Sequence, residues 1–397
     1  MEEKICFSTA DILLPKGNPD KFAVIACDQF TSEPDYWEKV KEFTKGYNSS
    51  LELILPEIYL SDDNTADINR INGNMRQYLK NGVFKEIKDS FVFVQRVQSD
   101  GVLRQGIIGK IDLKDFTYHA GGDGEIRSTE KTVLERIPPR AKIRENAPIE
   151  LPHVMLLFDD KEDSIMKYLT ENKNNFDSLY DFDLFGGSGS ILGYRVCAEF
   201  AQRVKDMLSD IKKENAGLLF CVGDGNHSLA AAKSIYEKSG RESDRYALAE
   251  IVNIHSPAIN FEPIYRVLFG VNPKSVMDEF VSFCAERGGK YSHTFKCVYK
   301  GGDEEITVNS DFTLPVAALQ DFLDTKKADI KIDYIHGIES TRKIAASDDD
   351  TLGFIFDGMK KEDLFRAVIK DGSLPRKTFS LGHALDKRFY LEARRIG

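Results

Sequence analysis

The sequence lacks several features that would assign it to a familiar class of protein. It contains no run of about 18 apolar residues, so we expect no membrane-spanning helix. The first residues, MEEKICFSTADILLPKG, are acidic from the second position and have no apolar core, so we expect no signal peptide. With 54 basic and 64 acidic side chains, the formal net charge is −10, which disfavours binding to nucleic acid. We therefore predict a cytoplasmic protein without a nucleic-acid or membrane partner.

The cysteine pattern and two missing motifs exclude further classes. The six cysteines form no Cys-x-x-Cys pair, so we expect reduced thiols and no structural zinc site. The sequence has no Gly-x-Ser-x-Gly element, and no Gly-x-Gly-x-x-Gly element opens a helix. A serine hydrolase and a Rossmann dehydrogenase are therefore not supported, and we expect neither haem nor flavin. The cysteines are Cys6, Cys27, Cys197, Cys221, Cys284 and Cys297.

The hydrophobic pattern alternates short β-rich runs with amphipathic helical stretches. Ser99-Asp100-Gly101 predicts a hairpin between two such runs, whereas other runs lead directly into helices. Because hairpins and strand–helix units both occur, we predict an α/β or α+β fold with a mixed sheet and flanking helices. Strands are predicted near 22–27, 91–97, 102–113, 154–158, 218–222, 292–299, 304–310, 330–335 and 352–357. Helices are predicted from Ser32, as N-cap, through Phe43 and near 67–79, 161–173, 197–214, 228–238, 274–287, 316–327 and 361–370.

The length of 397 residues suggests two or three domains, or one elaborated domain. No internal repeat or low-complexity tract divides the chain. We predict one unit over residues 1–397 with two lobes, 1–260 and 261–397, and a phosphate site in the first.

Residues 119–150 differ in character from their surroundings. The segment from His119 to Gly124 is rich in glycine, and the stretch from Arg127 to Arg144 is charged. It is long and polar for a plain connection, so we predict a functional or partner-facing segment. His119, like His153 just after this segment, has no partner at metal-ligand spacing.

The sharpest local signal is the segment Val222-Gly-Asp-Gly-Asn-His-Ser228. An apolar run enters a turn with two glycines, and an alanine-rich helix follows. The turn's backbone N–H groups and the positive end of the helix dipole would meet there and stabilise an anion, typically a phosphate. Asp224 and His227 could handle a metal ion or a proton. The spacing leaves open a tight turn in which Asp224 only caps backbone amides.

Asp224-Gly-Asn-His-Ser228 also resembles the Asp-Gly-His-His-Arg box of the bacterial and archaeal family known as domain of unknown function 1015. Further motifs of that family have counterparts here in the expected order, so the resemblance covers nearly the whole chain. These counterparts are Cys27-Asp-Gln-Phe-Thr-Ser32, Arg127-Ser-Thr-Glu-Lys131 with Arg140 and Arg144-Glu-Asn-Ala-Pro148, Glu262-Pro-Ile-Tyr-Arg266, Tyr334-Ile-His-Gly337 and Leu374-Pro-Arg-Lys-Thr378.

The resemblance implies a ParB/sulfiredoxin-like core with a nucleotide site. The family's box is similar to the nucleotide-binding box of ParB-type proteins, sulfiredoxin and free-serine kinases. The resemblance therefore implies ATP or ADP with magnesium as the bound group, and a small-molecule substrate. Carried over by position, Asp224, Gly225 and His227 would face the phosphates or their magnesium, and Asp224 and His227 are candidate catalytic residues. We also predict nucleotide contacts at Gly223, Asn226 and Ser228.

The sequence departs from the box at two positions. Asn226 stands in place of the first histidine, and Ser228 stands in place of the arginine. Losing that guanidinium removes a bidentate phosphate clamp. Another arginine would have to supply the charge, and the candidates are Arg127, Arg140, Arg144 and Arg266.

Two carboxylates are candidates for a catalytic base. Asp28 directly follows a predicted buried strand, and strand ends are where α/β proteins assemble their sites. A phosphoryl-transfer enzyme needs such a carboxylate to orient or deprotonate the attacking hydroxyl. Glu33 has a simpler interpretation, as a first-turn acid that the helix dipole favours.

Three functions are consistent with these residues. The leading one is transfer of phosphate from a nucleotide to a small hydroxylated metabolite such as serine, which the resemblance suggests. The second is a regulatory module that binds nucleotide without turnover. The third is a metal-dependent phosphoester hydrolase built on Asp28, Asp224 and His227.

Overall fold

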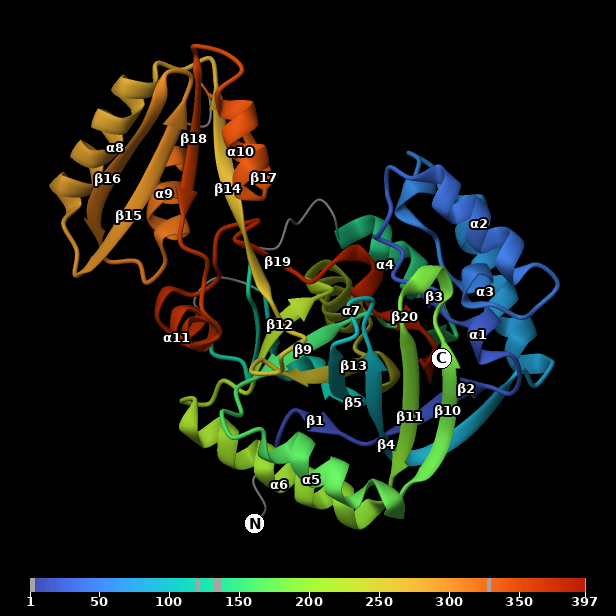
Figure 1. The fold of residues 1–397 in the computed structure, drawn as a ribbon. Coiled ribbons are helices and arrows are strands. Elements are labelled where there is room, and N and C mark those ends of the chain that lie inside the picture. The colour runs from blue at the N-terminus through green and yellow to red at the C-terminus, as the bar shows by residue number, and fades with distance from the viewer. Residues whose placement is uncertain (1–3, 119–121, 131–136, 327–329, 397) are drawn as a thin grey trace. The chain divides into compact units, whose positions relative to one another are not determined.

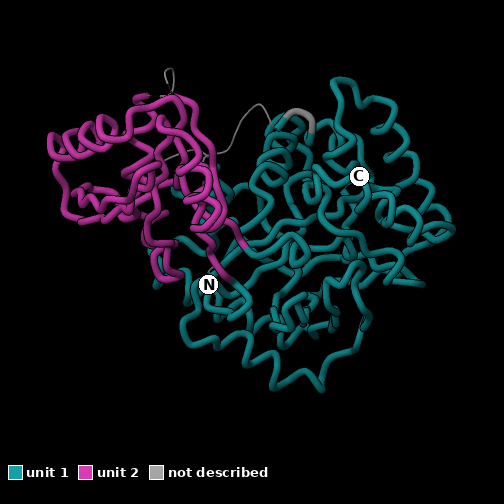
Figure 2. The backbone as a smooth tube through the Cα atoms, turned by 45° about the horizontal axis from the view of Figure 1, so that its top comes forward, with its two compact units in different colours: residues 1–128, 132–259, 382–397 teal, residues 129–131, 260–381 magenta. Residues whose placement is uncertain are grey.

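The computed structural model describes residues 4–118, 122–130, 137–326 and 330–396 (Figure 1). The chain divides into two compact units (Figure 2). Unit 1 comprises residues 1–128, 132–259 and 382–397, and unit 2 comprises residues 129–131 and 260–381. Residues 382–397, expected in a C-terminal lobe, thus lie in unit 1. None of the helices in the described ranges is long and apolar enough to span a bilayer.

Unit 1 is built on an eleven-stranded sheet with the main order β10-β11-β4-β5-β13-β9-β12-β7-β6. β1 pairs with β5 and β2 pairs with β4 beside this path. Parallel and antiparallel pairs both occur, so the predicted mixed sheet is confirmed. The bounds are β1 (Phe7–Ser8), β2 (Ala10–Pro15), β4 (Phe84–Val97), β5 (Leu103–Asp112), β6 (Phe116–Thr117), β7 (Ile126–Ser128), β9 (Met155–Phe158), β10 (Asp177–Asp183), β11 (Ser190–Val196), β12 (Phe220–Asp224) and β13 (Tyr246–Asn253).

The sheet of unit 1 is covered on both faces. Side chains alternate along a strand, so Phe91 and Phe93 of β4 join one core cluster and Val92 and Val94 join the other. Residues of α5, α6 and α7 complete the first cluster, and residues of α2 and α3 complete the second. Figure 1 shows α5 and α6 side by side beneath the sheet. The helices are α1 (Pro19–Phe22), α2 (Pro34–Thr44), α3 (Thr65–Lys80), α4 (Ile137–Glu145), α5 (Ser164–Asn172), α6 (Ala198–Glu214) and α7 (Asn226–Ser239).

Two short two-stranded ribbons pair the C-terminal segment of unit 1 with earlier segments of the chain. β3 (Val24–Ile25) pairs with β20 (Phe389–Tyr390), and β8 (Ile149–Glu150) pairs with β21 (Arg394–Arg395). The strand predicted over 22–27 is therefore reduced to two residues. This pairing places Tyr390 next to the residues that follow β3.

The helix expected after this strand begins differently from the prediction. Glu33, not Ser32, is the N-cap of α2, and no side chain caps the helix. Pro34 occupies the first turn, where its missing N–H has no consequence. Glu33 thus lies at the start of α2.

Unit 2 contains a six-stranded antiparallel sheet with the order β16-β15-β18-β14-β17, and β19 pairs with β14. Phe280, Phe295 and Phe354 meet edge to face in its core. The bounds are β14 (Phe261–Phe269), β15 (Tyr291–Tyr299), β16 (Gly302–Ser310), β17 (Lys331–His336), β18 (Thr351–Phe356), β19 (Phe379–Leu381), α8 (Pro273–Arg287), α9 (Pro315–Asp324), α10 (Ile338–Ala345) and α11 (Lys361–Asp371).

Candidate functional site

The turn between β12 and α7 has the backbone geometry that an anion site needs. Gly225 is the N-cap of α7 with φ 84°, and the helix begins at Asn226, two residues earlier than predicted. The first helical hydrogen bond runs from Leu229 N to Gly225 O at 2.9 Å. The backbone N–H groups before Leu229 in α7 have no carbonyl partner within the helix and point out of its N-terminal end, where anions are stabilised. Asp224 Oδ1 accepts from Gly225 N at 2.9 Å, so the capping role considered for Asp224 is present in the structure.

Replacing Gly225 with alanine is expected to destabilise the protein more than the same replacement at Gly240, at the other end of α7. Both glycines have a positive φ, 84° and 62°, so alanine is strained by roughly 1–3 kcal/mol at either position. A Cβ at Gly225 would in addition lie 3.1 Å from Val154 Cα, whereas nothing lies within 4 Å of the Cβ position of Gly240, so Gly240→Ala is the matched control. Urea unfolding of both variants measures the difference. A Gly225→Ala protein as stable as Gly240→Ala would contradict this account.

Three side chains from distant segments meet beside this turn. His153 Nε2 lies 3.7 Å from Asp28 Oδ2 and 3.4 Å from Ser228 Oγ. Asp28 follows β3, His153 precedes β9, and Ser228 lies in the first turn of α7. A hydrolase triad places its serine and its carboxylate on opposite ring nitrogens, whereas here both face Nε2. The arrangement therefore differs from that of a serine hydrolase.

Tyr390 fixes the orientation of the His153 ring. The Tyr390 hydroxyl donates to Cys27 Sγ at 3.1 Å and accepts from Cys27 N at 3.3 Å. His153 Nδ1 lies 2.7 Å from the same hydroxyl, and which of the two atoms donates depends on the tautomer of the ring. This contact leaves Nε2 facing Asp28 and Ser228. Burial raises the pKa of Cys27 to about 12, so this residue is a thiol at neutral pH.

The charges around Asp28 keep its carboxylate ionised. Burial raises the pKa of Asp28, but His153, the Gln29 amide, Lys387 and Arg140 together lower it below its ordinary value. Gln29 Nε2 donates to Asp28 Oδ1 at 2.9 Å. Asp28 is thus an anionic acceptor next to a ring nitrogen that can share a proton with it.

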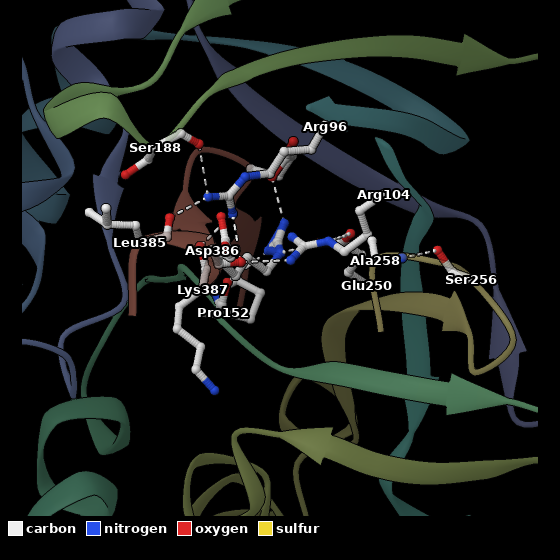
Figure 3. A network of polar contacts seen from close by, with 12 residues as sticks. Arg96, Arg104, Pro152, Ser188, Glu250, Ser256, Ala258, Leu385, Asp386 and Lys387 are labelled. Carbon is white, nitrogen blue, oxygen red and sulfur yellow. Dashed lines mark hydrogen bonds and ion pairs between the residues drawn. The ribbon is translucent and has the colours of Figure 1, made fainter. Parts of the chain in front are cut away.

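Lys387 links the two carboxylates of the site. Its Nζ lies 3.2 Å from Asp224 Oδ2, and its charge also acts on Asp28. Buried arginines hold the segment that carries it (Figure 3). Arg96 donates to Leu385 O at 2.6 Å, and both Arg96 and Arg104 donate to Asp386 O, at 3.1 and 2.7 Å. The backbone around Lys387 is therefore fixed from within the core.

The arginines considered as replacements for the missing clamp have different positions. Arg140 forms an ion pair with Glu57, and its positive charge also helps to lower the pKa of Asp28. Arg144 forms an ion pair with Glu150. Arg127 donates from Nε to a backbone oxygen of its own turn at 3.2 Å. Arg140 is therefore the best placed of these three to act near Asp28.

Arg266, the fourth candidate arginine, lies in unit 2, where it donates to backbone oxygens of β14 and of residues 376–377.

The other residues of the predicted box lie around the β12–α7 turn. Gly223 lies in β12, and His227 occupies the second position of α7. Asn226 Oδ1 is buried and has no hydrogen-bond partner in the described part of the chain. His119 lies outside the described residues. The described ranges contain no group of three or more His, Cys, Asp or Glu side chains that could hold a metal ion.

The family model described as "Protein of unknown function (DUF1015)" matches residues 11–326, which is most of the chain. The chain belongs to the DUF1015 family. No curated protein matches this DUF1015 protein.

Several solved structures are similar to the DUF1015 protein at low identity. A free serine kinase in complex with AMP is 13% identical, with a TM-score of 0.40 over 72% of this chain and 91% of that one. A conserved hypothetical protein from Pyrococcus furiosus is 10% identical, with a TM-score of 0.36 over 72% and 94%. SbnI with C-terminal truncation from Staphylococcus aureus is 7% identical, with a TM-score of 0.36 over 69% and 82%.

Proposed function

We propose that unit 1 is a nucleotide-dependent phosphotransferase that acts on a small hydroxylated molecule. The observation that carries this proposal is the meeting of an anionic Asp28, the His153 ring and Ser228 at the N-terminus of α7. A base for a hydroxyl and a helix terminus suited to phosphate thus lie next to each other.

The phosphate end of the proposed site uses the backbone of the β12–α7 turn. The N–H groups at the start of α7 would donate to phosphate oxygens, and Gly225 supplies the positive φ with which the chain turns from β12 into α7. Asp224 would repel the phosphate if it stood alone, but Lys387 at 3.2 Å offsets its charge. Arg140 would add positive charge near the phosphates, and its ion pair with Glu57 offsets part of that charge.

In the proposed reaction, the acceptor hydroxyl lies between Asp28 and His153. Its oxygen attacks the terminal phosphorus of ATP or ADP, and a new O–P bond forms. The bond from that phosphorus to the bridging oxygen breaks, so the nucleotide leaves with one phosphate fewer. The hydroxyl proton passes to Asp28. Because the pKa of Asp28 is low, this carboxylate is a weak base, so it first orients the hydroxyl and takes the proton only as the new O–P bond forms.

Magnesium fits this site as a companion of the nucleotide. Mg²⁺ is commonly held by one or two carboxylates together with substrate phosphates and water. Asp28 is the carboxylate that would contribute more directly, because both Asp224 oxygens already have protein contacts, with Gly225 N and Lys387 Nζ. The ion would supply positive charge for the phosphoryl group in transfer.

Replacing Lys387 with methionine is expected to weaken ATP or ADP binding by roughly 10- to 100-fold, the range for losing one charge-assisted contact. The reason is that Asp224 would lose its ion-pair partner at 3.2 Å and would repel the phosphates. The exposed Lys88, which pairs with Asp11 and Glu86, is the matched control. Calorimetric titration of both variants measures the change. Equal affinity of Lys387→Met and Lys88→Met would contradict the placement of the phosphates.

A thermal-shift panel with ATP, ADP, CTP and GTP, each with and without magnesium, tests the proposal. Ligand at about 100 times its Kd adds roughly 2.7 kcal/mol to stability, a rise in Tm of a few degrees. A selective shift, followed by phosphate transfer to an alcohol, is the expected result. Binding without any product would instead favour a regulatory module, and no shift with any nucleotide would overturn both.

A further inference from the structure

An apolar cavity of about 150 Å³ opens beside the site within unit 1. It is lined by His153, beside which the acceptor hydroxyl is proposed to lie, and by Ser228 and Tyr390, which contact His153. The rest of its wall is mostly aliphatic and comes from several elements of unit 1. Representative wall residues are Leu55, Met75, Ile143, Ala231 and Leu248.

The charged groups in this cavity wall are already paired with one another. Arg140 forms an ion pair with Glu57, and Arg144 forms one with Glu150. A zwitterionic amino acid would need countercharges for both its ammonium and its carboxylate group, and breaking these pairs would leave charges uncompensated. An apolar group needs no such partner and gains from leaving water. The wall therefore fits an apolar ligand better than serine.

We propose that this cavity binds the apolar part of the acceptor, so that the substrate class is a hydroxylated molecule with an apolar group of about six carbons. The size follows from comparison with an engineered protein cavity of ~150 Å³ that stays dry and binds benzene. That this ligand is the phosphate acceptor rests on the proposed function, whereas its apolar character rests on the cavity alone. The hydroxyl would face Asp28 and His153, and the apolar part would lie against Ile143 and Leu248.

A series of 1-alkanols from ethanol to 1-decanol, with serine for comparison, tests this inference in the full chain without nucleotide. Ligand-observed NMR titrations give the Kd values. We expect Kd to fall about fourfold per methylene, which is ~0.8 kcal/mol, up to about 1-hexanol and then to level off. Serine is expected not to compete with 1-hexanol.

Three variants on α4 separate the cavity from general effects on folding. Ile143→Trp fills the cavity and is expected to weaken 1-hexanol binding at least about tenfold. Ile143→Ala enlarges the cavity and is expected to move the levelling-off to longer alcohols. Glu145→Ala, an exposed position on the same helix, is the control and is expected to bind like the wild type. Circular dichroism confirms that each variant is folded.

The outcomes distinguish this inference from the proposed function. Chain-length dependence that Ile143→Trp removes supports the cavity as an apolar site, whether or not nucleotides bind. A Kd independent of chain length, unchanged binding in Ile143→Trp, or competition by serine would overturn the inference. Phosphate transfer to serine but not to 1-hexanol would also overturn it while leaving the phosphotransferase proposal in place.

Discussion

Replacing Asp28 with asparagine is expected to lower phosphoryl transfer by roughly 10²–10⁴-fold, the range for losing a general base. The amide keeps the size of the side chain and can still accept a hydrogen bond, but it cannot take the acceptor's proton. Without magnesium, nucleotide affinity is expected to stay the same or rise, because a negative charge near the phosphates is removed. Single-turnover transfer from radiolabelled ATP or ADP, together with calorimetric titration, separates the two effects.

Asp35 provides the matched control for this variant. It is an exposed carboxylate in the first turn of α2, and Asp35→Asn is expected to transfer phosphate at the wild-type rate. Full activity in Asp28→Asn would show that Asp28 is not the base. Loss of nucleotide binding in Asp28→Asn would show instead that the side chain serves the phosphate end of the site.

Replacing Arg388 with alanine is expected to destabilise unit 1 by about 3–5 kcal/mol, the range for breaking a buried ion pair from one side. Arg388 donates to Glu250 Oε2 at 3.0 Å and to Glu392 Oε2 at 2.6 Å, and all three side chains are buried. It also donates to Pro152 O at 2.9 Å, next to His153. The variant would leave two buried carboxylates without their shared cation.

Arg70 is the control for the Arg388 variant. It pairs with Asp67 and Glu52 on the surface, so Arg70→Ala is expected to change stability by about 0–1 kcal/mol. Urea unfolding of the full chain measures both. A difference between the two variants of less than about 1 kcal/mol would mean that water or rearranged side chains compensate Glu250 and Glu392. It would contradict the role of Arg388 as the cation that these two carboxylates share.

The fold class was predictable because it depends on local patterns. The apolar run at 91–97 serves two faces of one strand, and β4 places Phe93 and Val94 in opposite core clusters. The strand predicted over 22–27 failed for the converse reason. β3 has only two residues, and its partner β20 lies near the other end of the chain, where no local pattern announces the pairing.

The candidate site was predictable only where its signal was local. The turn before Ser228 carries two glycines ahead of a helix, and Asp28 follows an apolar run, so both were named from the sequence. His153, Tyr390 and Lys387 were not assigned to the site. Tyr390 reaches His153 across 237 positions of sequence, and such a contact exists only once the chain has folded. Their roles, like those of Asp28 and the β12–α7 residues, stay predictions until tested.

The sequence alone also did not show which arginine could take over from the arginine that Ser228 replaces in the box. The sequence offered Arg127, Arg140, Arg144 and Arg266 as equivalent substitutes. Their positions in the fold separate them, because Arg140 is the one of the four among the main contributors to the lowered pKa of Asp28. The side chain's position, not its presence in the charged segment, decides whether it can act there.

A crystal structure of the protein grown with ADP and magnesium tests the central claim most directly. We expect the phosphates within hydrogen-bond distance of the backbone N–H groups of Asn226, His227 and Ser228, with Lys387 and Arg140 nearby. Phosphates bound elsewhere in either unit, with the N-terminus of α7 facing only water, would contradict the account.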